Sequence, residues 1–157
     1  MSINYGFKNG FELQYKDIVP KIIAEYKLEN QDGTQVEDYK FFVFNGEVKL
    51  IQVDIDRFKN HRRNFYTIDW KYIPVSVLYP TDASVNLKKP DCLDKMIDIA
   101  QVLGKEFYHV RVDLYLVSGE IFFGEMTFTH GSGVEQFYPT SFGKIMGDWL
   151  ILPQSNC

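Results

Sequence analysis

The strongest constraint on the fold is a pair of adjoining segments with a two-residue hydrophobic repeat, between His109 and Gly133. The apolar residues of the first segment alternate with polar ones and are Val110, Val112, Leu114 and Leu116. The second segment alternates in the same way, and its first set is Phe122, Gly124, Met126 and Phe128. A period of two places alternate side chains on opposite faces of a β-strand. The sequence therefore predicts a hairpin with a tight connection at Ser118-Gly119.

The hydrophobic pattern also predicts the register of this hairpin, because a slip of one residue would move every side chain to the other face. The two apolar sets coincide when Val112 lies opposite Met126 and Leu114 lies opposite Gly124. This register requires an odd-numbered loop over residues 118–120, or a two-residue loop combined with a β-bulge.

The same register brings two carboxylates together on the polar face. Asp113 then lies opposite Glu125, and Arg111 lies opposite Thr127. Like charges directly opposite each other destabilise a sheet, so a compensating charge is expected. One candidate is a hard divalent cation such as Mg²⁺, which binds carboxylate oxygens. The alternative is that both acids face water, with Arg111 as the neighbouring counter-charge.

Size and composition exclude several classes of protein. The chain has 157 residues, of which 45% are hydrophobic and 24% charged, as expected for a single globular domain. Its net charge of −4 gives no support to a nucleic-acid-binding surface. No apolar run approaches the roughly 18 residues of a membrane span. The first residues, MSINYGFKNG, lack the apolar segment of a signal peptide. With only Cys92 and Cys157, we expect a cytoplasmic protein.

The first half of the chain predicts a second hairpin. A short apolar run, residues 22–24, suits a buried strand, although periodicity does not exclude a helical turn. The aromatic-rich segment 38–44 predicts a strand, and residues 47–56 predict its partner. Asn45-Gly46 between them is a strong two-residue turn signal, because both residues tolerate positive φ.

Residues 91–103 predict the one helix of the chain. Its apolar residues fall at helical spacing and are Leu93, Met96, Ile97, Ala100 and Leu103. We expect this stripe to pack on the sheet, with Lys95 and Asp98 outside. Asp91 and Asp94 form a capping-box-like pair at its start, and Gly104 is expected to stop it.

The order of these elements indicates an α+β domain with a largely antiparallel sheet and one main packing helix. Residues 1–157 divide into a lead segment (1–19), a hinge and hairpin (20–57), an irregular basic and aromatic segment (58–89), a helix (90–104), a hairpin (107–129) and a tail (130–157). The irregular segment suits single-stranded nucleic acid, an anionic small molecule or simply solvent. The net charge argues against nucleic acid.

Longer stretches of the chain resemble a known family. RVDLYLVSGEIFFGEMTF resembles the metal-binding hairpin of ATP-grasp ligases, in which an R-x-D strand pairs with a strand ending in E-x-N. Taken with DYKFFVFNGEVKLIQVDIDR, KPDCLDKMIDIAQVLG and FGEMTFTHGSG, it resembles the TupA-like, teichuronopeptide-biosynthesis branch of that superfamily. Members are associated with bacterial cell-surface polysaccharide clusters. The resemblance runs from Tyr15 to Leu152 and implies the fold of an ATP-grasp C-terminal subdomain.

The resemblance assigns roles to the central hairpin. Asp113 and Glu125 match the metal-ligand acids, and Arg111 matches a catalytic arginine beside the transferred phosphate. Thr127 stands where many members have a ligand asparagine, and its neutral hydroxyl is a weaker ligand. The implied reaction is ATP- and Mg²⁺-dependent ligation, in which a carboxylate forms an acyl phosphate and an amine then displaces phosphate. Arg111 and Mg²⁺ would offset the developing charge.

Nucleotide-binding positions follow from the same resemblance. Glu25 and Tyr26 resemble the hinge that meets the adenine ring, and Asp38 stands where an acid accepts from the ribose hydroxyls. Looser candidates for phosphate or acceptor contacts are Lys40, Arg57, Arg63 and Asn64.

The chain departs from the family at its beginning. ATP-grasp enzymes hold the nucleotide between two subdomains, and the first supplies lysines and a glycine-rich flap before the hinge. Only 24 residues precede Glu25 here, so the chain matches the C-terminal half. We therefore expect a complementing N-terminal grasp chain or self-association, through apolar surface left open around Ile22, Ile23 and Phe41.

Three functions are compatible with the sequence. The chain is a ligase half that turns over with a partner, or a remnant that binds a nucleotide or sugar phosphate without turnover. The third is a carbohydrate-interaction module that uses the aromatic residues Trp70, Tyr72, Phe137 and Tyr138. Retention of both acids and Arg111 favours the first two.

Overall fold

The computed structural model describes residues 17–34, 36–57, 59–85 and 87–154. Within them the chain forms an antiparallel sheet with the strand order β4-β3-β2-β1-β5-β6. The strands are β1 (Glu37–Phe44), β2 (Glu47–Ile55), β3 (Arg62–Tyr66), β4 (Tyr72–Ile73), β5 (His109–Val117) and β6 (Glu120–Thr127). The helices are α2 (Leu93–Gly104), the 3₁₀ turn η2 (His130–Gly133) and α3 (Ser141–Trp149). The predicted α+β fold class is confirmed.

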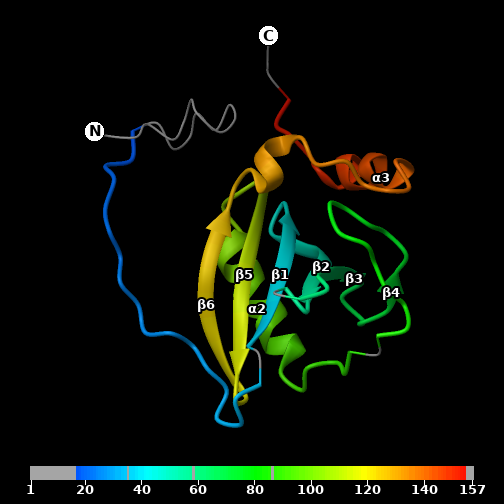
Figure 1. Cartoon of the computed structure of the whole chain (residues 1–157). Helices are drawn as coiled ribbons and strands as arrows, with labels where there is room; N and C mark the ends of the chain where they lie inside the picture. Colours follow the sequence, from blue (N-terminus) through cyan, green and yellow to red (C-terminus); the bar gives the residue numbers. More distant parts are fainter. Residues whose placement is uncertain (1–16, 35, 58, 86, 155–157) are drawn as a thin grey trace.

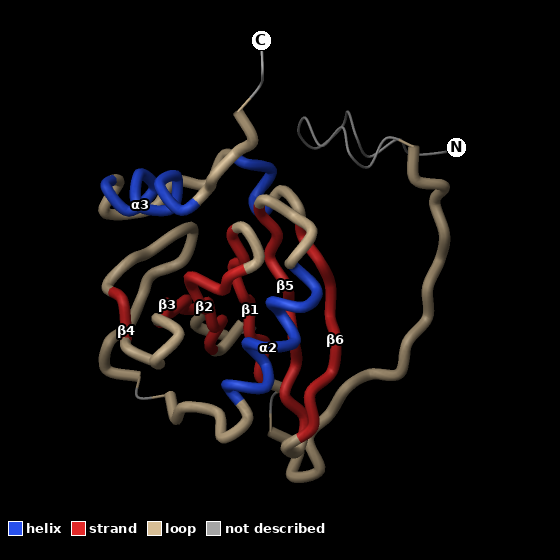
Figure 2. Tube along the Cα trace, turned by 180° about the vertical axis from the view of Figure 1, so that it is seen from behind, coloured by secondary structure: helices blue, strands red, loops and turns tan. Residues whose placement is uncertain are grey.

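The sheet separates two hydrophobic cores. Figures 1 and 2 show how α2 and α3 are placed around the sheet. Helix α2 covers one face, where Tyr39, Phe41 and Val43 of β1 are buried. On the other face, Phe42 and Phe44 are buried together with side chains of α3. This second core occupies only one end of its face, because α3 lies at the top of the sheet in Figure 1. The other end is left to polar side chains.

The central hairpin has the predicted register over its charged residues. Asp113 pairs with Glu125, and Val112 pairs with Met126. The connection is a two-residue turn in which Ser118 and Gly119 have φ of 49° and 87°. A bulge then restores the register, which was one of the two predicted solutions.

The bulge also corrects one predicted pair. Leu114 lies opposite Phe123, so Gly124 is the extra residue and does not face Leu114. A Cβ atom on Gly124 would lie 2.9 Å from Cε2 of Tyr115 and 3.0 Å from the carbonyl oxygen of Asp113. Real Cβ contacts are almost never this short, so the bulge suits glycine at this position.

Helix α2 forms where the sequence predicts it, but its ends differ. Leu93, Met96 and Ala100 are fully buried against the sheet, while Lys95 and Asp98 are exposed. The predicted capping box is wrong, because Cys92 is the N-cap residue and no side chain caps the helix.

Gly104 does not act as the predicted stop, because it is the last helical residue and Lys105 after it is still right-handed. Its role is close packing, since a Cβ atom there would lie 2.6 Å from Cγ1 of Val43.

Three further expectations were wrong. Residues 22–24 form no strand, and Ile22 is fully exposed. Phe41 is fully buried under α2, so it leaves no open surface. The segment 58–89 contains β3 and β4, and the tail contains α3. Among the described residues, no helix has the length and apolar character needed to cross a membrane.

Candidate nucleotide-binding face

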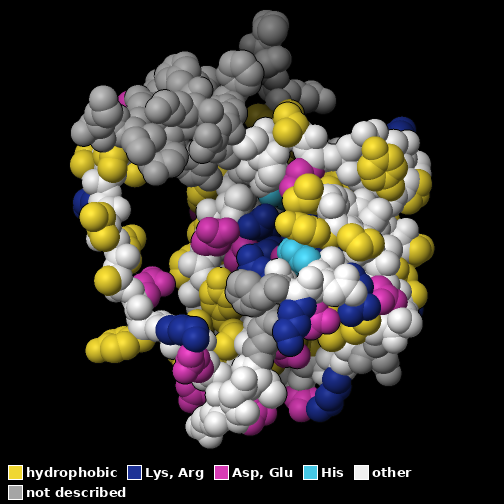
Figure 3. All heavy atoms as spheres, in the orientation of Figure 1, with side chains coloured by type: hydrophobic (Ala, Val, Ile, Leu, Met, Phe, Trp, Pro, Cys, Tyr) yellow, Lys and Arg dark blue, Asp and Glu magenta, His cyan; other side chains and the backbone are white. Residues whose placement is uncertain are grey.

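Alternation along the strands collects charged side chains on the end of the sheet that α3 leaves open. Lys40 of β1 pairs with Asp113 of β5 on one side and with Gln52 of β2 on the other. We call this surface the charged face, and its members are Asp38, Lys40, Gln52, Asp54, Arg57, His61, Arg63, Arg111, Asp113, Glu125 and Thr127. Figure 3 shows basic, acidic and histidine side chains gathered at the centre of this view.

Arg111 holds the acids of the central hairpin together. Its Nε donates to Oδ1 of Asp113 at 2.7 Å, and its Nη2 donates to Oδ2 at 2.8 Å. The same Nη2 contacts Oε1 of Glu125 at 3.1 Å and Oγ1 of Thr127 at 3.0 Å. Although burial opposes the charge on Arg111, its bonds to Asp113 raise its pKa above the usual value. The two opposed carboxylates are therefore compensated by a cationic side chain.

Lys40 extends this network to the next strand. Its Nζ lies 2.7 Å from Oδ2 of Asp113 and 2.8 Å from Oδ2 of Asp38. Arg57 adds a bond from Nη1 to Oδ2 of Asp38 at 2.8 Å. Burial raises the pKa of Asp38 above its ordinary value, and the charge of Lys40 opposes that shift. Lys40 thus holds the two buried carboxylates, Asp38 and Asp113, through one ammonium group.

A second acidic centre lies beside the first and was missed by the sequence interpretation. Asp54 of β2 is buried, and its Oδ1 accepts from Nε of Arg63 at 2.7 Å and contacts Nε2 of His61 at 3.1 Å. Burial alone would raise the pKa of Asp54, but the bonds from Arg63 and His61 lower it below its usual value. The signal was the alternation of Gln52 and Asp54 with apolar neighbours, which places them on the face of Lys40.

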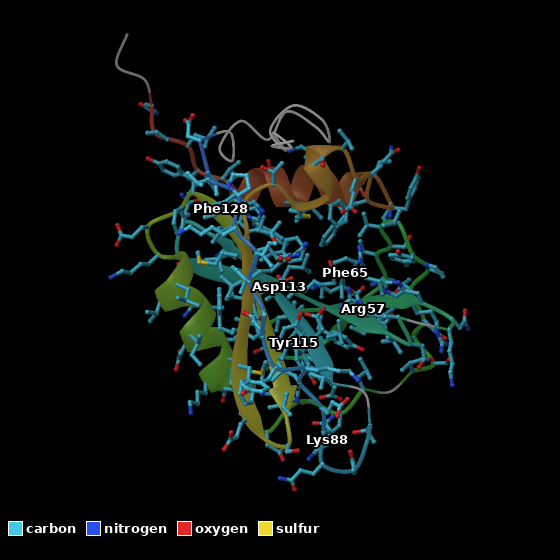
Figure 4. All side chains as sticks on the ribbon, turned by 60° about the vertical axis from the view of Figure 1, so that its left-hand side comes forward. Arg57, Phe65, Lys88, Asp113, Tyr115 and Phe128 are labelled. Atoms are coloured by element: carbon cyan, nitrogen blue, oxygen red, sulfur yellow. The ribbon has the colours of Figure 1, made fainter. Side chains whose placement is uncertain are left out.

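A pocket of about 540 Å³ opens beside the charged face. Its lining includes Asp38, Arg57 and Tyr115, together with residues 27–29, 33, 34 and 36 of the segment before β1. Figure 4 shows Asp113 and Tyr115 along β5, with Arg57 to one side of them. The Arg57 side chain is 41% exposed, and one of its nitrogens, Nη1, donates a hydrogen bond to Asp38. Arg57 is therefore the cation of this cluster that a ligand in the pocket reaches most easily.

The structure does not bring every predicted residue to this face. Glu25 and Tyr26 lie on an extended segment before β1, where Tyr26 is 99% exposed. Asn64 is fully buried on the opposite face, and its side chain is bonded to Thr81 and to the backbone of Asp82. The remaining predicted site residues lie on the charged face and are Asp38, Lys40, Arg57, Arg63, Arg111, Asp113, Glu125 and Thr127.

The four aromatic residues proposed for carbohydrate binding do not form one surface. Trp70 stacks on Tyr66 with ring centroids 4.3 Å apart and, like Tyr72, packs against the core under α2. Phe137 is buried in the core on the other face of the sheet, beside α3. Only Tyr138 among them is largely exposed. This arrangement offers no shared stacking platform for a sugar.

The donors present do not form a ready-made metal site. Among the described residues, no group of three or more His, Cys, Asp and Glu side chains could hold an ion. Both oxygens of Asp113 are engaged by Arg111 and Lys40, and Thr127 offers only a neutral hydroxyl. In this arrangement the pair Asp113 and Glu125 does not fit a Mg²⁺ ion held by the protein alone.

The fold and the charged hairpin are consistent with a subdomain of the ATP-grasp type. The sheet, its packing helix α2 and the pairing of the Arg-x-Asp strand with the strand that carries Glu125 and Thr127 agree with that type of subdomain. The chain belongs to the TupA-like ATP-grasp family, whose model matches residues 2–151. No curated protein and no solved structure matches the chain.

Proposed function

We propose that the charged face binds the phosphates of a nucleotide. Membership of the ATP-grasp family indicates ATP as that nucleotide. The observation that carries this proposal is the pairing of Asp113 with Glu125 beside Arg111 and Thr127 on an open sheet face. Family membership adds the expected role, ATP- and Mg²⁺-dependent carboxylate–amine ligation in bacterial cell-surface polysaccharide biosynthesis. A reaction that consumes ATP fits a cytoplasmic location.

Arg57 is the proposed first contact for an incoming phosphate. A guanidinium has five N–H donors in a planar fork that matches phosphate oxygens. Arg57 uses one nitrogen for Asp38, and its side chain is partly open to the pocket beside Tyr115. Asp38 then acts by orienting this guanidinium. Because the pocket continues along Lys27 and Glu29, it has room for more than the phosphate group.

Arg111 is the proposed second contact, closer to the centre of the sheet. Its Nε and Nη2 hold Asp113, Glu125 and Thr127, while Nη1 takes part in none of these bonds. Asp113 fixes the plane of the guanidinium through two parallel bonds, which reduces the conformational entropy that phosphate binding would cost. Bound Mg²⁺ would supply further neutralisation of phosphate charge, and none of the roles given to these side chains depends on it.

A phosphate-binding protein without turnover is the second candidate, and the charge balance of the site favours it. The cluster contains three carboxylates and three cationic side chains, all joined by ion pairs. The carboxylates are Asp38, Asp113 and Glu125, and the cations are Lys40, Arg57 and Arg111. This pairing leaves no carboxylate of the cluster uncompensated to act as a base. A sugar phosphate would satisfy the same basic side chains as a nucleotide.

Isothermal titration calorimetry tests the proposal with ATP, ATP with Mg²⁺, and glucose 1-phosphate as separate ligands. Arg57→Gln is expected to raise the Kd for the bound ligand about tenfold or more, since a hydrogen bond to a charged group contributes about 1.5–3 kcal/mol. Arg62→Gln is the matched control, because Arg62 is also paired with carboxylates but its partners are Asp56 and Asp82.

The three ligands separate the two candidates. Binding of ATP that strengthens with Mg²⁺ supports the nucleotide proposal, and formation of a hydroxamate from a carboxylate and hydroxylamine would add ligation. Equal binding of glucose 1-phosphate favours a sugar phosphate as the ligand, and binding without hydroxamate formation favours the second candidate. Absence of heat with all three ligands, or equal losses in Arg57→Gln and Arg62→Gln, would contradict phosphate binding at this face.

A further inference from the structure

A segment that precedes the sheet exposes large apolar side chains to solvent. Residues 18–29, which we call the arm, contain neither helix nor strand. Within the arm, Ile22 is 100% exposed, Ile23 is 78% exposed and Tyr26 is 99% exposed. Figures 1 and 2 show the arm running along the side of β6 but apart from it. Apolar surface of this extent, gathered in one segment, indicates an interaction site.

The sequence of the arm has the pattern of a half-buried strand. One set of alternate residues is mostly apolar and consists of Ile22, Ala24, Tyr26 and Leu28. The other set is mostly charged and consists of Ile23, Glu25, Lys27 and Glu29. Apart from Ile23, this alternation is typical of a β-strand with one face on a core. A single strand is not stable alone in water, so the pattern indicates that the arm pairs with a sheet.

The matching partner is the outer edge of β6. The strand order ends at β6, so no described strand covers this edge. Within the strand, Phe123 is 58% exposed and Phe122 is 36% exposed. A long edge strand with apolar side chains and unpaired backbone groups is a template for adding another strand. β6 is eight residues long, and the alternating part of the arm, residues 22–29, has the same length.

The faces of the two elements also match. Ile121 and Met126 pack at the margin of the core under α2, and Phe123 lies opposite the core residue Leu114. A strand added outside β6, with Ile22 and Tyr26 on the face of the sheet that α2 covers, would extend the core under α2. Its charged alternate residues would then continue the opposite, charged face.

The base of the arm is fixed at the tip of the central hairpin. The backbone N–H of Ser118 donates to Oδ1 of Asn30 at 2.9 Å, and the N–H of Gln31 donates to Oγ of Ser118 at 3.3 Å. From this point twelve extended residues reach about 40 Å at about 3.3 Å each. The arm therefore extends far enough to reach a neighbouring molecule while its base stays attached.

We propose that the arm pairs with the β6 edge of a second copy of this chain, in a reciprocal twofold dimer. Exchange covers the β6 edge of both copies at once, and closed twofold symmetry limits the assembly to two chains. In the described structure the arm stands apart from β6 of its own chain, as expected for a strand that is donated to another molecule.

Sedimentation velocity of the full chain tests the proposal without any ligand. The wild-type chain is expected to sediment as a dimer, and Ile22→Asp and Phe123→Asp as monomers. Val102→Asp is the matched control, because Val102 is 67% exposed on α2, away from both elements. Ile22 is fully exposed in the single chain, so its substitution does not threaten folding, and thermal unfolding of each variant checks this.

Mixing the two variants tests exchange between molecules directly. Ile22→Asp has an intact edge and Phe123→Asp has an intact arm, so one arm–edge contact returns only when both are present. We expect a heterodimer in the mixture and monomers in either variant alone. A simple patch contact of arm with arm, or edge with edge, would not be rescued by mixing.

Two results would overturn the proposal. A wild-type monomer at millimolar concentration would exclude the dimer, and lowered melting temperatures in both variants would then show that the arm docks on its own β6. A dimer that persists in both variants would place the interface elsewhere. Neither result depends on nucleotide binding, so failure here leaves the proposed function standing.

Discussion

Arg111 and Asp113, two positions apart on β5, form a bidentate pair. Nε of Arg111 donates to Oδ1 of Asp113 at 2.7 Å, and Nη2 donates to Oδ2 at 2.8 Å. Both side chains are nearly buried, with 14% and 2% of their areas exposed. Together with the contact to Glu125, the bidentate contact supplies a positive charge between the two acids that β5 and β6 place opposite each other. Arg111 was one of the two compensating charges that the sequence allowed, the other being a divalent cation, and the structure shows its contacts with both acids.

The first prediction is that Asp113→Asn destabilises the chain. Repulsion from Glu125 alone would have made the substitution stabilising. Instead, removal of the charge leaves Arg111 and Lys40 with less compensation in a buried site, which costs about 3–5 kcal/mol when one partner of a buried pair is lost. Urea unfolding followed by circular dichroism measures the loss.

Asp148→Asn is the matched control for this substitution. Asp148 is bonded to Lys144 on the surface of α3, where both side chains are more than half exposed. Exposed pairs of this kind contribute about 0.3–0.5 kcal/mol. Equal effects of the two substitutions, or a more stable Asp113→Asn protein, would contradict the counter-charge role of Asp113.

The second prediction contrasts two helical glycines. Gly104→Ala should destabilise by about 1–3 kcal/mol, because the new methyl group would overlap Val43 in a packed core. Gly147→Ala in α3 meets no atom within 4 Å and should stabilise by up to about 1 kcal/mol through helix propensity. Thermal unfolding distinguishes the two. A stabilised Gly104→Ala protein would show that α2 moves freely over β1.

The third prediction concerns the packing of α2. Met96 is fully buried in the core between α2 and the sheet. Met96→Ala should therefore cost about 2–5 kcal/mol, from lost burial and the cavity left behind. Val102→Ala on the exposed side of the same helix should change stability by less than about 0.5 kcal/mol. A difference within experimental error in chemical denaturation would count against this face as core.

The sequence predicted the hairpins and α2 because their hydrophobic periods leave few alternatives. A one-residue slip in β5 would move Asp113 into the apolar core under α2 and Val112 onto the charged face, so pattern alone selects the register. Whether the loop or a bulge absorbs the odd residue depends on sterics around Gly124, which a pattern does not contain. Strand β3 was missed because the adjacent basic residues Arg62 and Arg63 hide its alternation.

The candidate site was predictable to the same extent. Asp113, Glu125 and Arg111 share a hairpin, so local register brings them together. Asp54 lies on the face of Lys40 through the predicted hairpin of β1 and β2, but Arg63 and His61 reach it only because β3 pairs with β2, and that pairing was not foreseen. The helix α3 was missed for a similar reason: nine residues with two glycines have little intrinsic helix propensity, and Phe142 and Met146 gain stability from the core they reach.

The last prediction concerns acid sensitivity at the boundary between the charged face and the core beside α3. His130 packs with its ring centroid 5.1 Å from that of Phe42 and 5.6 Å from that of His109. Burial, helped by the charge of the surrounding bases, lowers the pKa of His130 to about 4. Burial also lowers the pKa of His109. Both imidazoles are therefore neutral in the folded chain at neutral pH.

The sign of the effect follows from proton binding. Between an unfolded pKa of about 6.5 and the folded value, the unfolded chain binds more protons, so the free energy of unfolding falls as the pH falls. Burial raises the pKa of Asp38, so Asp38 opposes this trend in the pH window between its ordinary pKa and its raised folded pKa. From pH 7 to pH 5, His130 should contribute a loss of about 1–2 kcal/mol.

His130→Phe keeps an aromatic ring at this position and removes the titrating group. Urea unfolding at pH 7 and pH 5 should therefore show a smaller loss of stability for His130→Phe than for the wild type, by about 1–2 kcal/mol. The comparison uses the change between the two pH values, so any constant cost of fitting phenylalanine cancels. Parallel losses in the two proteins would show that His130 is already protonated in the folded state or is open to water.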